Sequence, residues 1–424
     1  MKAYRAALWL VLPWALARLV WRARAYPRYA GRWRERLGHG PSLPAGSLWI
    51  HAVSVGETRA GAPLIRRLLE DYPGIPLVVT TTTFTGAAEV ERLFGDSVRH
   101  RFAPFDLPRA IARFLAAVQP RAAIILETEL WPCLFDALDR ARIPLALANV
   151  RLSERSYRGY RRVRRTARAL LQVPSVIAAQ SGADANRLRA LGAPAGRVHV
   201  TGNMKFELTH TAGLREAAQA LHQAWGMRPV WVAASTHDGE EEWVLDAHRR
   251  LRARHPALLL VLVPRHPERF ETAARLLRHR GVAFVERSRA APVDDDTQVV
   301  LGDTMGELSL FFACAECAFI GGSLVPVGGH NPLEALALGV PVVFGPHMFN
   351  FEEIAGLTLR AGAGRQVAGG EELADAIDAY LAQRADREAA GRAGLALVQE
   401  NQGALTRALA LLKPLLDATP SADP

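Results

Sequence analysis

Residues 321–346, GGSLVPVGGHNPLEALALGVPVVFGP, contain the pattern that decides the fold. An apolar strand (Cys317–Ile320) runs into a glycine-dense loop, a helix is expected to begin at Asn331-Pro332, and a second apolar run follows at Val340–Phe344. Asparagine is a favoured N-cap residue, and proline is favoured at the first helical position. The stretch therefore predicts a strand, a loop, a helix and a second strand of an α/β domain.

The same loop is a candidate ligand site. A helix start carries free N–H groups and the positive end of the helix dipole, which together suit a phosphate. Glycines allow a ligand to approach the backbone closely, and the carboxylate of Glu334 can accept hydrogen bonds from a sugar diol. These features are typical of a nucleotide-sugar site, although glycine-rich turns also occur for tight packing alone.

Outside this stretch, short apolar runs alternate with amphipathic segments in two series. The strands expected in the first series are Leu48–Val53, Leu77–Thr82, Ala122–Leu126, Leu145–Asn149 and Val176–Ala179. The strands expected in the second are Val230–Ala234, Leu258–Val263, Val282–Val285, Val299–Leu301, Ala318–Ile320 and Val340–Phe344. Helices such as Thr85–Phe94 and Ser181–Leu191 are expected between them. We expect an α/β protein with two doubly wound, Rossmann-like domains that face each other across a cleft.

Length and composition are consistent with this architecture. A chain of 424 residues suits two domains, and its 50% hydrophobic and 22% charged content is typical of a folded globular protein. The expected parts are residues 1–40, an N-terminal domain at 41–208 and a C-terminal domain at 209–424. The three cysteines (Cys133, Cys314 and Cys317) cannot form a disulfide framework and lack metal-site spacing. The CxxC at Cys314 and Cys317 lies in an apolar run, which favours core packing over a redox pair.

Two local blocks account for the net charge of +10. Residues 1–40 are formally +8, residues 151–168 are +7, and the rest of the chain is −5. This pattern favours specific anionic surfaces over general nucleic-acid binding, since no nucleic-acid-binding motif is found.

The apolar run from Ala6 to Trp21, followed at once by arginines, permits three interpretations. It is short for a full membrane span, but its tryptophans and the arginines after it fit a membrane anchor that either spans or lies in the interface. A cleaved signal peptide and a soluble amphipathic helix remain the alternatives. The anchor is favoured, with the body of the protein on the cytoplasmic face.

Ligands of open parallel sheets bind at the carboxyl ends of the strands, where several polar residues stand. In the first half, Glu57 follows a strand as either a helix cap or a general base, and Glu127 and Glu129 follow another. The arginine-rich segment at 151–168 is either a solvated helix face or, as we favour, a site for a phosphorylated acceptor. Lys205 lies between the halves, and polar side chains follow two strands of the second half: Ser235, Thr236, His237, Arg265 and His266.

Eight of these segments occur in the order found in a known family. They are HAVSVGE (51–57), ETELWP (127–132), NVRLSERS (149–156), GNMKFE (202–207), STHDGEEE (235–242), LVPRHPERF (262–270), MGELSLFF (305–312) and GGSLVPVGGHNPLEA (321–335). Together they strongly resemble the 3-deoxy-D-manno-octulosonic acid (Kdo) transferases of lipopolysaccharide assembly, which use CMP-Kdo as donor and the lipid A precursor as acceptor. Cys133 and Glu207 depart from the residues expected in relatives.

The resemblance implies a GT-B-type fold, an inverting transfer without metal or other cofactor, and an enzyme at the inner membrane. It implies that the domain at 41–208 binds the acceptor and the domain at 209–424 binds CMP-Kdo. It also implies that Glu57 is the catalytic base, which reverses the preference for a simple cap, and that Glu127 is a second important acid. The donor residues implied are Arg265, His266, Gly306, Ser323, Asn331 and Glu334, with Ser235 and Lys205 in support. From the arginine block itself, the candidates for the acceptor's phosphates are Arg151, Arg155, Arg158 and Arg161.

Two other functions remain open on the sequence. One is another two-domain nucleotide-sugar enzyme, either a UDP-sugar transferase or an epimerase. The other is a non-catalytic, membrane-tethered nucleotide-sugar binding protein, which the acids at the strand ends of the first domain argue against.

Overall fold

The computed structural model describes residues 26–208 and 213–418, and of the first 25 residues only positions 4, 8, 10, 12–14, 17–19, 21 and 24. The chain forms two compact units. Unit 1 contains Met1–Glu207 and Gln402–Pro424, and unit 2 contains Leu208–Asn401. The predicted boundary near residue 208 agrees with this division. The prediction that the C-terminal domain extends to residue 424 does not, because the last helix belongs to unit 1.

Unit 1 is a seven-stranded parallel sheet in the order β3-β2-β1-β4-β5-β6-β7. Its strands are β1 (Ser47–His51), β2 (Leu77–Thr81), β3 (Arg99–Phe102), β4 (Pro120–Leu126), β5 (Leu145–Val150), β6 (Val176–Ala179) and β7 (Val198–Val200). Its helices are α2 (Val55–Asp71), α3 (Phe84–Phe94), α4 (Pro108–Val118), α5 (Pro132–Arg140), α6 (Glu154–Arg162), α7 (Arg164–Leu171), α8 (Gly182–Leu191) and α17 (Ala404–Asp417). Short 3₁₀ segments are η1 (Pro27–Leu37), η2 (Gly95–Ser97), η3 (Ala195–Arg197) and η4 (Met204–Phe206).

Unit 2 is a second seven-stranded parallel sheet, in the order β10-β11-β9-β8-β12-β13-β14. Its strands are β8 (Val230–Thr236), β9 (Leu259–Pro264), β10 (Phe284–Glu286), β11 (Val299–Leu301), β12 (Cys317–Ile320), β13 (Val342–Phe344) and β14 (Gly364–Gln366). Its helices are α9 (Leu214–Ala224), α10 (Glu240–Arg252), α11 (Phe270–His279), α12 (Leu308–Ala313), α13 (Leu333–Leu336), α14 (Glu352–Arg360), α15 (Gly370–Ala382) and α16 (Arg384–Asn401). Short 3₁₀ segments are η5 (Pro267–Arg269) and η6 (Arg287–Arg289).

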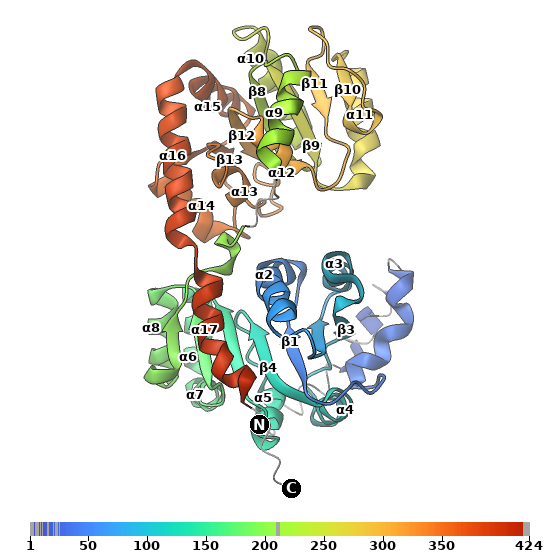
Figure 1. Cartoon of the computed structure of the whole chain (residues 1–424), viewed down its shortest axis with the longest axis vertical. Coiled ribbons are helices and arrows are strands. Elements are labelled where there is room, and N and C mark those ends of the chain that lie inside the picture. Colours follow the sequence, from blue (N-terminus) through green and yellow to red (C-terminus); the bar gives the residue numbers. More distant parts are fainter. Residues whose placement is uncertain are drawn as a thin grey trace. The chain divides into compact units, whose positions relative to one another are not determined.

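The strands of unit 1 are buried on both faces because their side chains alternate between two hydrophobic cores. In β1, Trp49 packs with α4, α5, α7 and α8, whereas Leu48 and Ile50 pack on the opposite face with α2 and α3. Helix α17, red in Figure 1, covers that second face as well, through buried residues such as Ala408 and Leu412. The C-terminal segment therefore completes the core of unit 1.

The strands that the sequence pattern missed all lie at sheet edges. β3 (RHRF) and β7 (VHV) are the two edges of unit 1, and β14 (GRQ) is an edge of unit 2. An edge strand pairs on one side only and is less buried, so it need not be an apolar run. The central strands were predicted to within a few residues.

Much of the expected anchor, Ala6–Trp21, lies outside the described residues. Of those that are described, Leu10, Trp14 and Trp21 are exposed, Leu19 packs against a small core of Tyr29 and neighbouring rings, and the Tyr4 hydroxyl donates a hydrogen bond to Asp106. Within the described positions, no helix combines the length and apolar character needed to span a membrane.

Candidate active site

Glu57 stands at the start of α2, directly after the carboxyl end of β1. Ser54 is the N-cap of this helix, and its hydroxyl accepts a long hydrogen bond from the Glu57 N–H, 3.5 Å. In return, the Glu57 carboxylate accepts hydrogen bonds from the Val53 N–H (2.7 Å) and the Ser54 hydroxyl (3.0 Å). This is a variant of the capping box in which the acid reaches the N–H of the residue before the N-cap, so the interpretation of Glu57 as a helix cap is correct at the level of geometry.

The electrostatics of Glu57 differ from those of an ordinary cap. Its side chain is buried, and that burial raises the pKa to about 7, with the neighbouring carboxylates Glu127 and Glu129 contributing in the same direction. The hydrogen bonds from Val53 and Ser54 oppose the shift without cancelling it. A carboxyl group with a pKa near neutrality is suited to accept a proton, so the cap and the base interpretations are compatible.

Glu129 is the acid whose role was not assigned from the sequence. Its carboxylate accepts a hydrogen bond from the Trp131 indole at 2.7 Å, and burial raises its pKa. Burial raises the pKa of Tyr160 in α6, and the Glu129 carboxylate contributes in the same direction. Glu129 therefore shares the electrostatic environment of Glu57. Its position in the sequence, two residues after Glu127, did not indicate this.

Strained backbone marks the carboxyl ends of three central strands. Glu127, Asn149 and Ser235 are non-glycine residues with left-handed φ values of 57°, 55° and 57°. The pairing of β5 with β6 is irregular at Asn149, and that of β8 with β9 is irregular at Ser235. Such conformations cost on the order of 1–3 kcal/mol each and persist where the surrounding structure imposes them, often at functional sites.

Two further side chains in unit 1 have buried polar atoms without hydrogen-bond partners. Asn149 accepts a hydrogen bond from the Met204 N–H through Oδ1, which leaves its Nδ2 unpaired. Gln180 donates from Nε2 to the Asn149 carbonyl oxygen, which leaves its Oε1 unpaired. A donor at the end of β5 and an acceptor directly after β6 are thus unsatisfied within the described residues. No pattern in the sequence indicated this pair.

In unit 2, the glycine loop after β12 is held by a carboxylate of the protein. Glu240, fully buried at the start of α10, accepts hydrogen bonds from the N–H groups of Gly322 (2.6 Å), Ser323 (3.0 Å) and Leu324 (2.9 Å). It also accepts one from the His237 N–H at 2.9 Å. These loop N–H groups therefore bond an internal anion and not a ligand phosphate. In the sequence, the only indication of this role was that Glu240 is the first of three consecutive acids (240–242) at the start of a helix.

The predicted helix after the loop is a single turn. α13 spans four residues, and its N-cap is Pro332 and not Asn331 as expected. The Asn331 side chain accepts a hydrogen bond from the Leu333 N–H at 3.2 Å, and Glu334 lies half-buried in the turn. A helix this short has little macrodipole, so it is a weaker seat for phosphate than the sequence suggested.

The structure does not leave the Ser323 hydroxyl available to a ligand. Ser323 is fully buried, and its hydroxyl donates to the Ile320 carbonyl oxygen and accepts from the Gly345 N–H at 2.8 Å. A Cβ added at Gly345 would lie 2.3 Å from the Ser323 carbonyl oxygen. Ser323 therefore shapes the loop, and direct donor contact by its side chain is not supported.

The positively charged part of unit 2 lies at the carboxyl ends of β8 and β9. The ring of His237 stacks on His330 with centroids 5.1 Å apart, and it meets the exposed His266 edge-on at 5.6 Å. Burial lowers the pKa of His237, and the nearby His266, Arg265 and Arg269 lower it further. Positive charges that disfavour a protonated histidine favour a bound anion at the same place.

The remaining predicted residues are distributed over both units. Ser235 ends β8 in the strained conformation already described, and Gly306 occupies an exposed turn with a φ of 88°. Lys205, half-buried in η4, belongs to unit 1, whereas the other predicted donor residues belong to unit 2.

The arginine block forms the helices α6 and α7. No side chain of α6 is buried, and Glu154 is its one acid, paired with Arg158 and Arg187. Arg161 packs over the Tyr157 ring, and Arg155 is exposed, whereas Arg151 lies half-buried before the helix. The block is therefore an exposed, positively charged face of unit 1.

The cysteines and other potential metal ligands give no catalytic centre. All three cysteines are free and buried, and burial raises the pKa of Cys314 to about 11 and that of Cys317 as well. This confirms the core-packing interpretation over the redox pair. In the part of the chain that the structure describes, no group of three or more histidine, cysteine or acidic side chains could hold a metal ion.

Comparisons with known proteins identify similar sequences over almost the whole chain. Residues 31–208 match the family described as 3-deoxy-D-manno-octulosonic-acid transferase (kdotransferase). The chain is 44% identical over 396 residues to the 3-deoxy-D-manno-octulosonic acid transferase of Haemophilus influenzae, covering 92% of this chain and 93% of that protein. It is 38% identical over 417 residues to the enzyme of that name from Bordetella pertussis, covering 94% and 96%.

The fold is similar to that of solved nucleotide-sugar enzymes. The crystal structure of UDP-GlcNAc 2-epimerase from Neisseria meningitidis matches with a TM-score of 0.58 at 14% identity, covering 87% of this chain and 100% of that chain. At this identity the likeness concerns the fold alone. The two parallel-sheet α/β units resemble the GT-B architecture, as predicted.

Proposed function

The chain belongs to the 3-deoxy-D-manno-octulosonic acid (Kdo) transferases and is therefore a glycosyltransferase, and from this premise we propose that it moves Kdo from CMP-Kdo to a hydroxyl of the lipid A precursor (lipid IVA) with inversion at the anomeric carbon. The observation that carries the proposal is the Glu57 carboxyl group, whose pKa is raised to about 7 at the carboxyl edge of the sheet of unit 1.

The proposed step is a single displacement. The Glu57 carboxylate takes the proton of the acceptor hydroxyl as the oxygen bonds to the anomeric carbon of Kdo. The bond from that carbon to the phosphate of CMP breaks, and CMP leaves with the electron pair. Attack opposite to the leaving group inverts the anomeric configuration. Glu127 and Glu129 support the step by raising the pKa of Glu57, which strengthens it as a base.

We assign the donor to unit 2. Arg265 and His266 follow β9 beside His237, where the local positive charge would stabilise the phosphate of CMP-Kdo as it leaves. The Glu240 carboxylate would act indirectly, by fixing the glycine loop that leads to Asn331 and Glu334. Transfer would need neither a metal nor another cofactor, so it should persist in the presence of a chelator such as EDTA.

We assign the acceptor to unit 1. The arginines of α6, with Arg151 before it, would bind the phosphates of the lipid through bidentate contacts. An enzyme with a lipid acceptor must work at a bilayer, and the basic N-terminal segment with its exposed tryptophans is consistent with the cytoplasmic face of the inner membrane.

Mass spectrometry of the product formed from CMP-Kdo and a tetraacyl lipid A precursor tests the proposal. The expected product is the precursor carrying added Kdo, with release of CMP. UDP-sugars offered in place of CMP-Kdo should give none. Transfer from a UDP-sugar, or donor binding without any turnover, would contradict the proposed reaction.

A further inference from the structure

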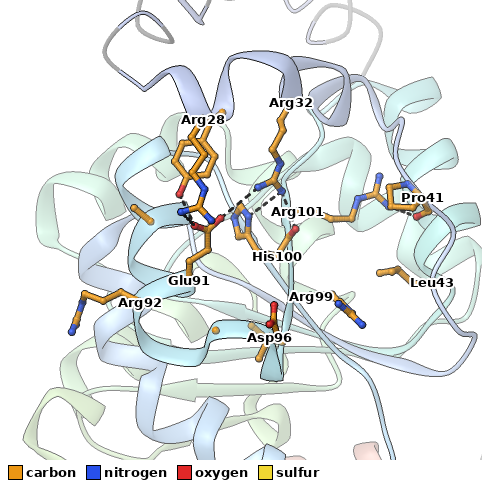
Figure 2. Close-up of a pocket in the computed structure, with 14 residues that line it drawn as sticks. Arg28, Arg32, Pro41, Leu43, Glu91, Arg92, Asp96, Arg99, His100 and Arg101 are labelled. Atoms are coloured by element: carbon orange, nitrogen blue, oxygen red, sulfur yellow. Dashed lines mark hydrogen bonds and ion pairs between the residues drawn. The ribbon is translucent and has the colours of Figure 1, made fainter.

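A pocket of about 630 Å³ lies at the β3 edge of unit 1 (Figure 2). It is formed by η1, the loop after it, the end of α3 and β3 itself. Five arginines line it: Arg28, Arg32, Arg92, Arg99 and Arg101. Its acids are Glu91 and Asp96. With a neutral His100, the lining carries a formal excess of three positive charges.

Part of this charge is neutralised by the protein. Glu91 pairs with Arg28 at 3.1 Å and accepts a hydrogen bond from the Tyr29 hydroxyl at 3.0 Å. Arg92 pairs with Glu89 at 2.8 Å. Glu91 also lies 3.9 Å from Arg32, so Arg99 and Arg101 are the lining arginines that have no ion-pair partner among the described residues.

Arg101 is the unusual member of the set. Its side chain is only 3% exposed, and it donates to the carbonyl oxygens of His39 (2.9 Å) and Pro41 (3.5 Å). No carboxylate of the described residues forms an ion pair with it, and its Nε has no hydrogen-bond partner. The Glu35 carboxylate favours the charged form of Arg101 from a distance, but it is already paired with Arg32, so a bound anion would further stabilise this buried cation.

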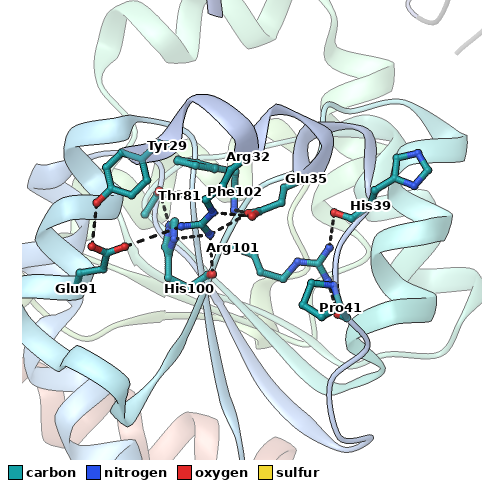
Figure 3. Close-up of polar contacts among 10 residues, drawn as sticks. All are labelled: Tyr29, Arg32, Glu35, His39, Pro41, Thr81, Glu91, His100, Arg101 and Phe102. Carbon is teal, nitrogen blue, oxygen red and sulfur yellow. Dashed lines mark hydrogen bonds and ion pairs between the residues drawn. The ribbon is translucent and has the colours of Figure 1, made fainter. Parts of the chain in front are cut away.

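A fixed network holds the pocket in shape (Figure 3). Arg32 forms a bidentate pair with Glu35, at 2.6 and 3.0 Å, and donates to the His100 carbonyl oxygen at 2.9 Å. His100 is held by Thr81 through its Nε2, and burial followed by the positive charges of Arg32 and Arg36 lowers its pKa to about 3. Glu35 also accepts from the Phe102 N–H at 2.7 Å. These contacts join η1 to β3, so the arginines are preorganised.

Arg99 is the arginine that can reach a ligand without disturbing the fold. It is exposed, and within residues 26–208 and 213–418 it has no ion-pair or hydrogen-bond partner. Figure 2 shows its guanidinium at the side of the pocket, apart from the Arg28–Glu91 pair. Exposed tryptophans occur in the same part of the chain. Trp33 lies in η1 and is 40% exposed, and the exposed Trp14 and Trp21 precede η1 in the sequence. Arginines together with tryptophans are typical of a membrane interface.

We propose that this pocket binds the phosphate of an anionic phospholipid head group in the bilayer, with Arg99 and Arg101 as its main cationic contacts. The binding site is separate from the proposed transfer reaction, because none of its residues belongs to the donor or acceptor assignments. It would hold η1 and β3 against the bilayer surface.

Vesicle co-sedimentation of the full chain tests the proposal without any assay of transfer. The probes are vesicles of phosphatidylcholine alone and of phosphatidylcholine mixed with phosphatidylglycerol. The wild type should prefer the mixed vesicles. Arg99→Ala should weaken that binding about fivefold, since one arginine near an anionic surface contributes about that factor. The matched control Arg392→Ala removes the same charge from exposed α16 and should change nothing.

A variant at Gly40 separates pocket geometry from net charge, and one at Arg101 tests the buried cation itself. A Cβ at Gly40 would lie 2.3 Å from a terminal nitrogen of Arg101, so Gly40→Ala should displace the guanidinium and weaken binding without changing the charge. Arg101→Gln should weaken it too, with circular dichroism to verify folding. Equal binding by wild type, Arg99→Ala and Gly40→Ala would overturn the proposal.

Other outcomes would assign the pocket elsewhere. Stabilisation of the wild type by inorganic phosphate, lost in Arg99→Ala while vesicle binding is unchanged, would mean a soluble phosphate ligand and refute the lipid. A higher acceptor KM for Arg99→Ala in a detergent-dispersed assay, where no bilayer exists, would assign the pocket to the acceptor and refute it as well.

Discussion

Replacing Glu57 with glutamine separates the two roles that the structure allows for this side chain. Glutamine can form the capping box as glutamate does, because its carbonyl oxygen can accept from Val53 and its amide can donate to the Ser54 oxygen. It cannot accept a proton from a hydroxyl at neutral pH. If Glu57 were a cap alone, Glu57→Gln would be nearly silent, whereas a base predicts loss of transfer.

The magnitude follows from the raised pKa. Glu57 titrates at 4.5 in an ordinary environment and at about 7 in the folded protein, so the folded state keeps a proton that the unfolded chain releases. The stability of the wild type therefore falls as the pH rises from 4.5 to 7, by about 3 kcal/mol. Glu57→Gln lacks this loss. We expect the variant to be more stable than the wild type above pH 7 by about 3 kcal/mol, while transfer falls at least about 100-fold.

The assay pairs denaturant unfolding with kinetics over the same pH range. The difference in unfolding free energy between variant and wild type should grow from pH 4.5 to 7 and then level off. The wild-type kcat/KM should rise through pH 7 as Glu57 loses its proton, with CMP binding retained by the variant. Glu400→Gln, on an exposed part of α16, is the control and should show neither change.

Near-wild-type turnover of Glu57→Gln would refute the assignment of Glu57 as the base. A stability difference that does not depend on pH between 4.5 and 7 would refute the electrostatic reasoning, even if turnover were lost. The two measurements can therefore fail independently.

Three further predictions concern both units. Glu240→Ala should lower the unfolding free energy by about 3 kcal/mol or more in a denaturant titration, because four N–H groups lose their acceptor. The control Glu242→Ala, on the exposed side of α10, should be almost neutral in the same titration. Burial lowers the pKa of His248 to about 3, so the wild type should lose stability as the pH falls below 6.5. His248→Gln should reduce the slope of unfolding free energy against pH between 6.5 and 4 by the amount that corresponds to about one bound proton. An unchanged slope would contradict this. In steady-state kinetics, the double variant Arg155→Glu with Arg161→Glu should raise the acceptor KM at least about fivefold and leave the KM for CMP-Kdo unchanged. An unchanged acceptor KM would refute the proposal that these arginines bind the acceptor's phosphates.

The local pattern of the chain predicted most of the fold. Buried parallel strands are apolar runs, so β1, β2, β4 and β5 were visible in the sequence. The helix expected at Ser181–Leu191 was visible as well, and in the structure Ser181 is the N-cap of α8. Three of the four edge strands (β3, β7 and β14) were missed because an edge strand can be polar, whereas the edge strand β10 was predicted. The placement of α17 on unit 1 was missed because nothing in a helix's own sequence says which of two sheets it will cover.

The candidate site was predictable as a set of residue types and not as a set of contacts. The resemblance over eight segments indicated the family, and Glu57 was expected at the start of a helix, as a cap from its position or as a base from the resemblance. Its raised pKa depends on burial and on Glu127 and Glu129, which lie about 70 residues away in sequence.

The glycine loop also shows which features were predictable from local sequence and which depended on tertiary contacts. Its sequence predicted that a strand would end in a glycine loop before a helix, since glycine spacing and the Asn-Pro pair act locally, although the helix is a single turn. Only the tertiary structure decided what the loop's N–H groups bind, because Glu240 comes from a helix 82 residues earlier in the chain. Local sequence fixes the conformations available to a segment, whereas burial and charge are set by the residues that folding brings against it.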